Sequence, residues 1–104
     1  MSEQIKKGML DAYVLAIIKR NDSYGYKIVQ NLEGFVEMSE STLYPILRRL
    51  EKQGCLSTYS LERNGRVRKY YHVTEYGDKQ LSSYVHEIKR LKTNLDILVS
   101  RTKD

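Results

Sequence analysis

The Asn-Gly pair at residues 64 and 65 is the feature that most constrains how this chain can fold. It separates two strand-like runs, CLSTYSLER at residues 55–63 and RVRKYYHV at residues 66–73. Asn-Gly is the strongest short-range signal for a two-residue hairpin turn, because both residues tolerate the positive φ that the turn requires. The sequence therefore predicts an antiparallel hairpin in a chain whose other apolar patterns are helical.

The predicted turn also fixes which side chains share a face of the hairpin, because the side-chain period of a strand is two. Arg63 then lies opposite Arg66, and like charges facing each other destabilise a hairpin. The inner face holds Leu56, Tyr71 and Val73, and the outer face holds Arg63, Arg66, Arg68 and Tyr70. Between Arg63 and Lys69 the chain has four basic residues and no acid, which indicates an external anion as their partner.

Three helical segments precede the hairpin. The first, residues 5–20, repeats apolar residues at spacings of three and four. Asp22 or Ser23 is the expected N-cap of the second, YGYKIVQNLEGF at residues 24–35. The third is STLYPILRRLEKQG at residues 41–54. The fold class is therefore mainly α with a small β-hairpin.

The third segment has one apolar and one polar face at α-helical spacing. Its apolar face holds Leu43, Ile46, Leu47 and Leu50, and its other sides carry Ser41, Thr42, Tyr44, Pro45, Arg48, Arg49 and Lys52. Ser39 or Ser41 is the expected N-cap. Pro45 is tolerated only early in a helix, so the helix begins just ahead of it, and Gly54 ends it.

A last helix of about 27 residues, capped by Thr74, is about 40 Å long at 1.5 Å per residue. Its apolar residues recur at alternating spacings of three and four, as in a coiled-coil seam: Leu81, Tyr84, Ile88, Leu91, Leu95 and Leu98. A helix of this length cannot pack along its whole length on so small a domain. The seam therefore predicts a second helix, most simply the same one from another subunit. A helix folded back on the domain's own core is the alternative.

Charge and composition exclude several classes of protein. The 104 residues carry a formal net charge of +5, which favours a nucleic acid or a membrane surface as partner. The apolar run near the N-terminus is interrupted by Asp11 and is too short to span a bilayer, so we expect a soluble cytoplasmic protein. Cys55 is the only cysteine and reads as a small buried hydrophobe, with a redox sensor as the alternative. His72 and His86 make no metal motif with it, so we expect no enzyme, metal or cofactor.

Three short helices followed by a two-stranded hairpin are the arrangement of a winged helix-turn-helix domain. Residues 41–54 would be its recognition helix, with hydroxyls that donate to phosphates and basic side chains that reach phosphates or guanine edges. The hairpin tip would be the wing, entering or straddling a minor groove. The alternative for the basic residues is a solvated face, and for Tyr24, Tyr44 and Tyr70 it is packing at the joints between elements.

In three stretches the sequence resembles the PadR-like family of transcriptional regulators. YGYKI at residues 24–28 is similar to the family's Gly-Tyr motif, and STLYPILRRLEKQG is similar to its recognition helix. GRVRKYYHVTEYG at residues 65–77 is similar to its wing and the step into the last helix. The resemblance, closest to the short branch of the family, implies a homodimeric repressor of a near-palindromic operator. It also implies a small aromatic or hydrophobic effector near the dimer interface, although the drug-stacking tryptophan of multidrug-sensing members has no counterpart here.

We therefore expect a DNA-binding domain at residues 1–74 and a dimerisation helix at residues 75–104. The expected DNA-binding residues are Tyr24, Ser41, Thr42, Tyr44, Pro45, Arg48, Arg49, Lys52, Arg63, Gly65, Arg66, Arg68, Lys69 and Tyr70. The expected dimer-interface residues are Met9, Tyr13, Ile17, Leu81, Tyr84, Ile88, Leu91, Leu95 and Leu98. A winged-helix module for protein interaction or ligand binding, without operator-specific DNA binding, is the alternative function.

Overall fold

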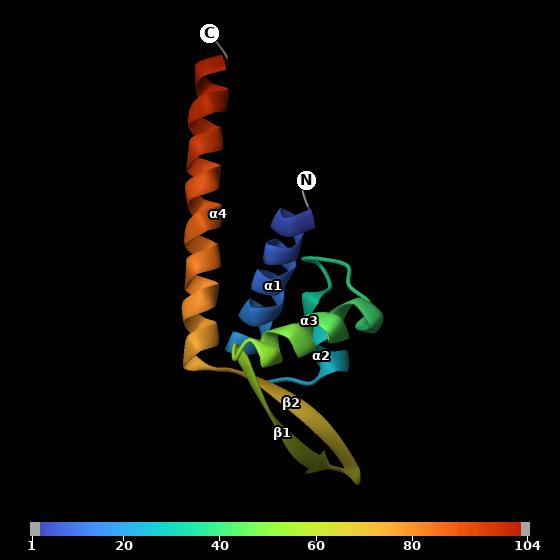
Figure 1. Ribbon diagram of the computed structural model, residues 1–104. Coiled ribbons are helices and arrows are strands. Elements are labelled where there is room, and N and C mark those ends of the chain that lie inside the picture. Colours follow the sequence, from blue (N-terminus) through green and yellow to red (C-terminus); the bar gives the residue numbers. More distant parts are fainter. Residues whose placement is uncertain (1–2, 103–104) are drawn as a thin grey trace.

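The computed structural model describes the backbone of residues 3–102 and the side chains of residues 8–101. Four helices and one hairpin follow in the order α1 (Glu3–Arg20), α2 (Gly25–Leu32), α3 (Glu40–Lys52), β1 (Leu56–Arg63), β2 (Arg66–Val73) and α4 (Glu75–Thr102). In Figure 1 the short helices α1, α2 and α3 form one compact unit, the hairpin extends from its lower end, and α4 stands beside α1. The mainly helical fold with one hairpin is confirmed.

The core lies between the three short helices, the base of the hairpin and the start of α4. Its fully buried side chains are Val14, Leu15, Ile18, Ile28, Leu32, Leu43, Leu47 and Leu50. Burying a side chain of this size stabilises the fold by about 1.5–3 kcal/mol each. Leu56 and Tyr71 close the core from the hairpin, and Leu81 closes it from α4. The apolar faces predicted for α3 and for the hairpin are therefore the ones that the fold buries.

The hairpin has the predicted register, with Arg63 opposite Arg66 and Leu56 opposite Val73. Asn64 and Gly65 have φ values of +53° and +77°, as a two-residue turn of this hand requires. Ser23 adds a single antiparallel bridge to Tyr71, at the outer edge of β2. The sheet therefore has two strands and one short flanking segment.

Caps define where the helices begin and end. Ser39 is the N-cap of α3, since its Oγ accepts the Thr42 N–H at 3.2 Å. Gly54, at φ +83°, ends this helix in a Schellman motif, with the Cys55 N–H bonded to the Leu50 carbonyl at 2.8 Å. Thr74 caps α4 as expected, because its Oγ1 accepts the Gly77 N–H at 3.0 Å.

Two boundary predictions were wrong. The N-cap position of α2 is Tyr24, which makes no side-chain capping bond, so neither Asp22 nor Ser23 caps this helix. Both are instead engaged with the hairpin. Pro45 lies in the second turn of α3, which begins at Glu40, so the proline marks the helix start less closely than expected.

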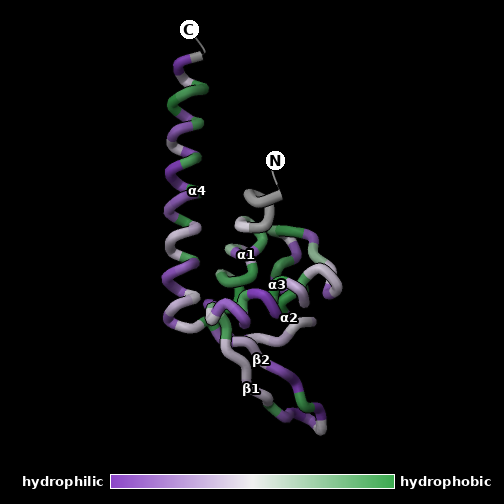
Figure 2. Tube along the Cα trace, viewed as in Figure 1, coloured by the Kyte–Doolittle hydropathy of each residue, from purple (hydrophilic) through white to green (hydrophobic). Residues whose placement is uncertain are grey.

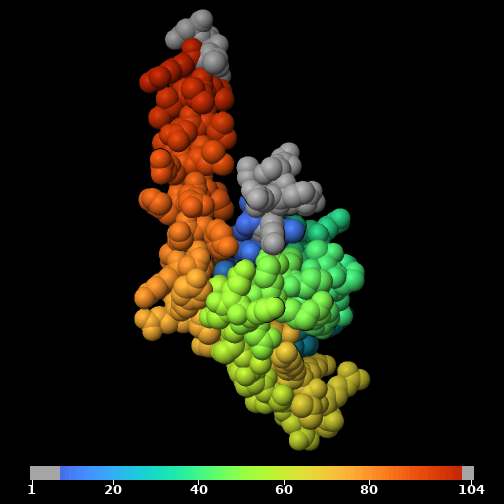
Figure 3. Space-filling view, in the orientation of Figure 1, coloured from blue at the N-terminus to red at the C-terminus, as the bar shows by residue number. Residues whose placement is uncertain are grey.

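The helix α4 gives the molecule an elongated shape. Its 28 residues extend well past the other helices (Figure 3), and the molecule measures 64 × 26 × 22 Å. The radius of gyration is 16.2 Å, against about 13 Å for a compact domain of this length. Along the tube in Figure 2, apolar and polar residues alternate on this extension. None of the described helices combines the length and the apolar character needed to cross a membrane.

Candidate nucleic-acid interface

The outer face of α3 is polar and open to solvent. The exposed residues of α3 are Glu40, Ser41, Thr42, Tyr44, Pro45, Arg48 and Lys52. At its N-terminus the Ser39 hydroxyl lies 2.9 Å from the Ser41 hydroxyl and 3.2 Å from the Thr42 hydroxyl. Ser39 is committed to the cap, so Ser41 and Thr42 are the hydroxyls that this end of the helix offers to a ligand.

Arg49 does not share that outer face. Its guanidinium forms an ion pair with the Asp11 carboxylate of α1, and the side chains are 24% and 6% exposed. A charge this buried requires a partner, because removal from water penalises it. Arg49 therefore joins α3 to α1, a role that differs from both the DNA contact and the solvated face considered for it from the sequence.

Tyr44 packs tightly against the start of α2. A β-carbon built on Gly25 would lie 2.4 Å from the Tyr44 hydroxyl oxygen and 2.7 Å from the ring carbon that bears it. A side chain at residue 25 would have to displace Tyr44, so the glycine of the Gly-Tyr motif at residues 25–26 provides room for the tyrosine of α3. The Gly-Tyr motif is part of the resemblance to the PadR-like family, but the residues around it in the sequence do not show why a glycine is needed there.

The tip of the hairpin is basic and exposed, with Arg63, Gly65 and Arg66 open to solvent. Lys69 lies further down, where its ammonium is 3.6 Å from the Glu51 carboxylate of α3. The run from Arg63 to Lys69 contains no acid, but an acid from another element balances one of its charges. The expectation that the four basic residues are uncompensated is therefore wrong for Lys69.

Arg68 and Tyr70 lie on the outer face of the hairpin, as predicted, but this face is partly covered. The Tyr70 ring stacks on Tyr59 of β1 at a centroid distance of 5.6 Å and meets the edge of Tyr24 at 5.4 Å. The Arg68 guanidinium lies over the Tyr24 ring, 4.3 Å from its centroid. Tyr24 and Tyr70 therefore pack at the joint between α2 and the hairpin, whatever else they contact.

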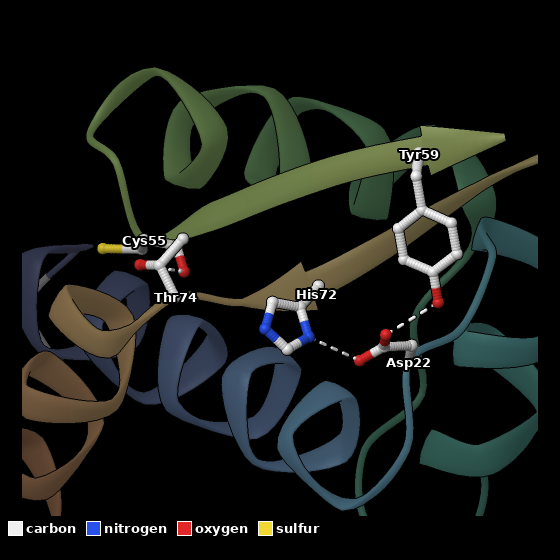
Figure 4. A network of polar contacts seen from close by, with 5 residues as sticks. All are labelled: Asp22, Cys55, Tyr59, His72 and Thr74. Atoms are coloured by element: carbon white, nitrogen blue, oxygen red, sulfur yellow. Dashed lines mark hydrogen bonds and ion pairs between the residues drawn. The ribbon is translucent and has the colours of Figure 1, made fainter.

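Asp22 holds both strands of the hairpin at this joint. It accepts the Tyr59 hydroxyl at 2.7 Å, and its other oxygen is 2.9 Å from His72 Nδ1 (Figure 4). Burial raises the pKa of Asp22, but the bonds from Tyr59 and His72 outweigh it, so the net pKa is below its usual value. The hydrogen bond to Asp22 raises the pKa of Tyr59. The sequence does not predict the cluster of Asp22, Tyr59 and His72, because a polar residue just before a helix favours a capping role for Asp22.

A groove of about 530 Å³ lies between α2, α3 and the hairpin. It is lined by Tyr24 and Gly25 from the start of α2, by Glu40 and Tyr44 from α3, and by Arg66, Arg68, Lys69 and Tyr71 from β2. A second groove of about 440 Å³, lined by Lys27 and Arg63 among others, shares Tyr24, Arg66 and Arg68 with the first. The structure thus brings Tyr44 of α3 and the basic residues of β2 to one concave surface, whereas the other residues predicted on α3 line neither of these two grooves.

The residues expected at a dimer interface divide into two groups. Leu81 is 8% exposed within the single chain and belongs to its own core, and Tyr84 and Ile17 pack against that core. The start of the seam therefore folds back on the domain, contrary to a purely intermolecular seam. Met9 is half-buried and Tyr13 is 36% exposed. The remaining seam residues are 42–56% exposed: Ile88, Leu91, Leu95 and Leu98.

Cys55 is buried, and burial together with the charge of Asp11 raises the pKa of its thiol. A reactive cysteine needs a lowered pKa and access to solvent, so this residue has the properties of a packing residue. Its backbone carbonyl accepts the Thr74 N–H at 3.0 Å. Among the described residues, no group of three or more His, Cys, Asp or Glu side chains is placed to hold a metal ion.

Comparison with known proteins agrees with this geometry. The sequence pattern of the transcriptional regulator PadR-like family matches residues 14–83. A protein from Streptococcus mutans of known crystal structure is 43% identical, with a TM-score of 0.83 over 96% of this chain and 94% of that one. A PadR-like transcriptional regulator from Bacillus cereus is 32% identical, with a TM-score of 0.81 over 93% and 97% of the chains.

A third relative is an uncharacterized protein from Lysinibacillus sphaericus, 34% identical over 91% of this chain and 92% of its own length. The family pattern runs from within α1 to the start of α4 and includes α2, α3 and the hairpin, which line the basic grooves. The fold, that surface and these similarities lead to one assignment. The chain belongs to the PadR-like family of transcriptional regulators, and it is a DNA-binding regulator by that membership.

Proposed function

We propose that this regulator is a dimeric repressor that binds a near-palindromic operator through α3 and the hairpin. In this proposal α3 enters a major groove, and the hairpin lies on the flanking backbone or minor groove. The observation that carries it is the shared groove, where Tyr44 of α3 faces the same space as Arg66 and Arg68 of β2. A surface of this kind suits a phosphate backbone, because basic side chains that displace counterions supply most of the affinity for DNA.

The dimer is proposed from the exposed part of α4. Ile88, Leu91, Leu95 and Leu98 form an unpartnered apolar stripe at coiled-coil spacing on the part of the helix that projects from the domain. In such a dimer, each subunit would contribute a DNA-binding domain, residues 1–74, and a dimerisation helix, residues 75–104. The two dimerisation helices would pack against each other. A two-fold axis then places two recognition helices on operator half-sites that are about 34–36 Å, or one helical turn, apart.

Repression and its release follow from the same geometry. A dimer bound across a promoter in the cytoplasm would exclude polymerase from it. A small aromatic or hydrophobic effector near the dimer interface would release DNA only if it binds the DNA-incompatible dimer better than the competent one. Its effect on the protein would be a change in the distance or angle between the two α3 helices.

The test is a gel-shift titration on the DNA upstream of the protein's own gene, with excess scrambled competitor and several salt concentrations. The Arg66→Ala, Arg68→Ala variant tests the hairpin, and Lys89→Ala, Arg90→Ala on α4 removes the same charge elsewhere as a control. We expect a shift that survives competitor, weakens steeply with salt, and is weakened by the hairpin change only. A shift lost to competitor, followed by a random-library selection that enriches nothing, would contradict operator-specific binding.

A further inference from the structure

The segment between α1 and α2 lies along the free edge of β2. Ser23 and Tyr71 exchange two backbone hydrogen bonds, with N–O distances of 3.3 and 2.8 Å. Residues two apart in an extended segment face the same side, so Asp22 and Tyr24 both face the outer side of the hairpin. The side chains of Asp22 and Tyr24 therefore lie next to His72 and Tyr70 on the outer face of β2.

A continuous chain of contacts runs across that face. Asp22 bonds Tyr59 of β1 at 2.7 Å and His72 of β2 at 2.9 Å, as Figure 4 shows, and Tyr59 stacks on Tyr70. Tyr70 meets the edge of Tyr24, and the Tyr24 ring carries the Arg68 guanidinium at 4.3 Å. The contacts therefore connect a carboxylate in the α1–α2 segment with an arginine that lines both basic grooves.

The same segment contacts the recognition helix. Gly25, directly after Tyr24, packs against Tyr44 of α3, because a β-carbon on this glycine would lie 2.4 Å from the tyrosine hydroxyl oxygen. Tyr24 and Gly25 thus touch the hairpin on one side and α3 on the other. A two-stranded hairpin is marginally stable alone, so its angle to α3 depends on these contacts together with the ion pair between Lys69 and Glu51.

We infer that Asp22 is a positioning residue for DNA binding, holding the hairpin against Tyr24 so that Arg68 is oriented toward the DNA backbone. The inference rests on the proposed function. Asp22 would act without touching DNA, since its carboxylate is occupied by Tyr59 and His72. Ordering Arg68 before binding lowers the entropy lost on binding, which is how a pre-organised contact gains affinity.

The direction in which Asp22→Ala changes DNA affinity distinguishes a positioning role from a simple effect of charge. Removing a negative charge from a DNA-binding protein ordinarily tightens binding. Positioning predicts that Asp22→Ala weakens it instead, by about tenfold. Glu75→Ala is the matched control, because this carboxylate belongs to an exposed pair with Lys79 at 4.0 Å and is 90% exposed. The control should leave affinity unchanged or slightly higher.

The measurement is fluorescence anisotropy on a duplex of mixed sequence, about 30 base pairs, titrated at several salt concentrations. In the wild-type background, Arg68→Ala should remove about one phosphate contact. The slope of log affinity against log salt concentration should then become smaller in magnitude by roughly 0.9. Asp22→Ala should lower it by a similar amount, and Arg68→Ala should then add less than about twofold. Full additivity of the two changes, or a slope that Asp22→Ala leaves intact, would overturn the inference.

Tyr59→Phe provides a second test that keeps the charge and the ring stacking and removes one hydrogen bond to Asp22. It should weaken binding in the same direction by about twofold, with an unchanged circular dichroism spectrum. Unaltered binding by this variant would also overturn the inference. Because the duplex has no operator, this test does not depend on sequence specificity. If the protein binds this duplex but selects no operator, only the proposed function is contradicted. If it binds no DNA, both the proposed function and the role of Asp22 are contradicted.

Discussion

Gly25 and Tyr44 are in such close contact that a β-carbon on the glycine would be 2.4 Å from the tyrosine hydroxyl oxygen. The contact joins the first residue of α2 to the exposed face of α3. It therefore fixes the angle between the two helices of the helix-turn-helix at the point where α3 begins its outer surface. Tyr44 is 37% exposed and lines the groove, so it contacts α2 and still faces solvent.

The first prediction concerns this contact. Gly25→Ala should displace the Tyr44 ring and weaken DNA binding, although alanine by itself favours a helix by about 1 kcal/mol over glycine. In a Tyr44→Ala background the same change should be neutral or stabilising. Urea unfolding of the four proteins should therefore give a coupling energy of about 1 kcal/mol or more. Additive effects would mean that the two residues do not constrain each other.

The second prediction separates the two halves of the α4 seam. Leu81→Ala should lower the free energy of unfolding by about 2–4 kcal/mol at every protein concentration, because Leu81 is part of the domain core. Leu95→Asp should instead shift the sedimentation coefficient toward the monomer, because Leu95 is 52% exposed in the single chain. Asn94→Asp places the same charge beside the seam and is the control. A monomeric wild type would contradict the proposed dimer.

The third prediction distinguishes two neighbouring arginines of α3. Arg49→Ala should cost about 2–3 kcal/mol of stability, since it removes the ion pair with the buried Asp11 carboxylate. Arg48→Ala, at an exposed position, should cost less than about 0.5 kcal/mol. At a temperature where both variants are folded, Arg48→Ala should weaken DNA binding more than Arg49→Ala does. The paired measurements are thermal unfolding and anisotropy on one duplex.

The fourth prediction concerns pH. Because the folded-state pKa of Asp22 is lowered, its contribution to stability is present above the unfolded pKa near 3.8 and is lost as pH falls through the folded value. Wild type should therefore exceed Asp22→Asn in unfolding free energy at pH 6, and the difference should shrink below about pH 4. Urea titrations across this range measure the difference. A constant gap would show that the carboxylate charge does not stabilise the hairpin joint.

The parts of the fold that the sequence predicted depend on neighbouring residues. Asn64 and Gly65 determine a turn by their own backbone preferences, and Ser39 and Thr74 cap the helices that directly follow them. Alternating or helical apolar spacing then identified the buried faces. Each of these signals lies within a few residues, where a single sequence carries enough information.

The contacts that the sequence could not predict join residues far apart along the chain. Tyr59 is 37 positions from Asp22, and Arg49 is 38 positions from Asp11. A charged residue in a polar stretch of sequence is expected to be exposed, and the sequence does not show which distant residue will bind it after folding. Likewise, Gly77 must be glycine because a β-carbon there would be 2.1 Å from the Cys55 carbonyl oxygen, a requirement that appears only once α4 meets the α3–β1 turn.

Two subunits of the proposed dimer read one operator, each with its α3 and its hairpin. The most direct measurement is selection of binding sites from a random DNA library by the wild-type protein, followed by sequencing. A dimer of this kind should enrich an inverted repeat whose half-site centres are about 10–10.5 base pairs, or a multiple of that turn, apart. Enrichment of a single asymmetric site, or of no sequence at all, would contradict it.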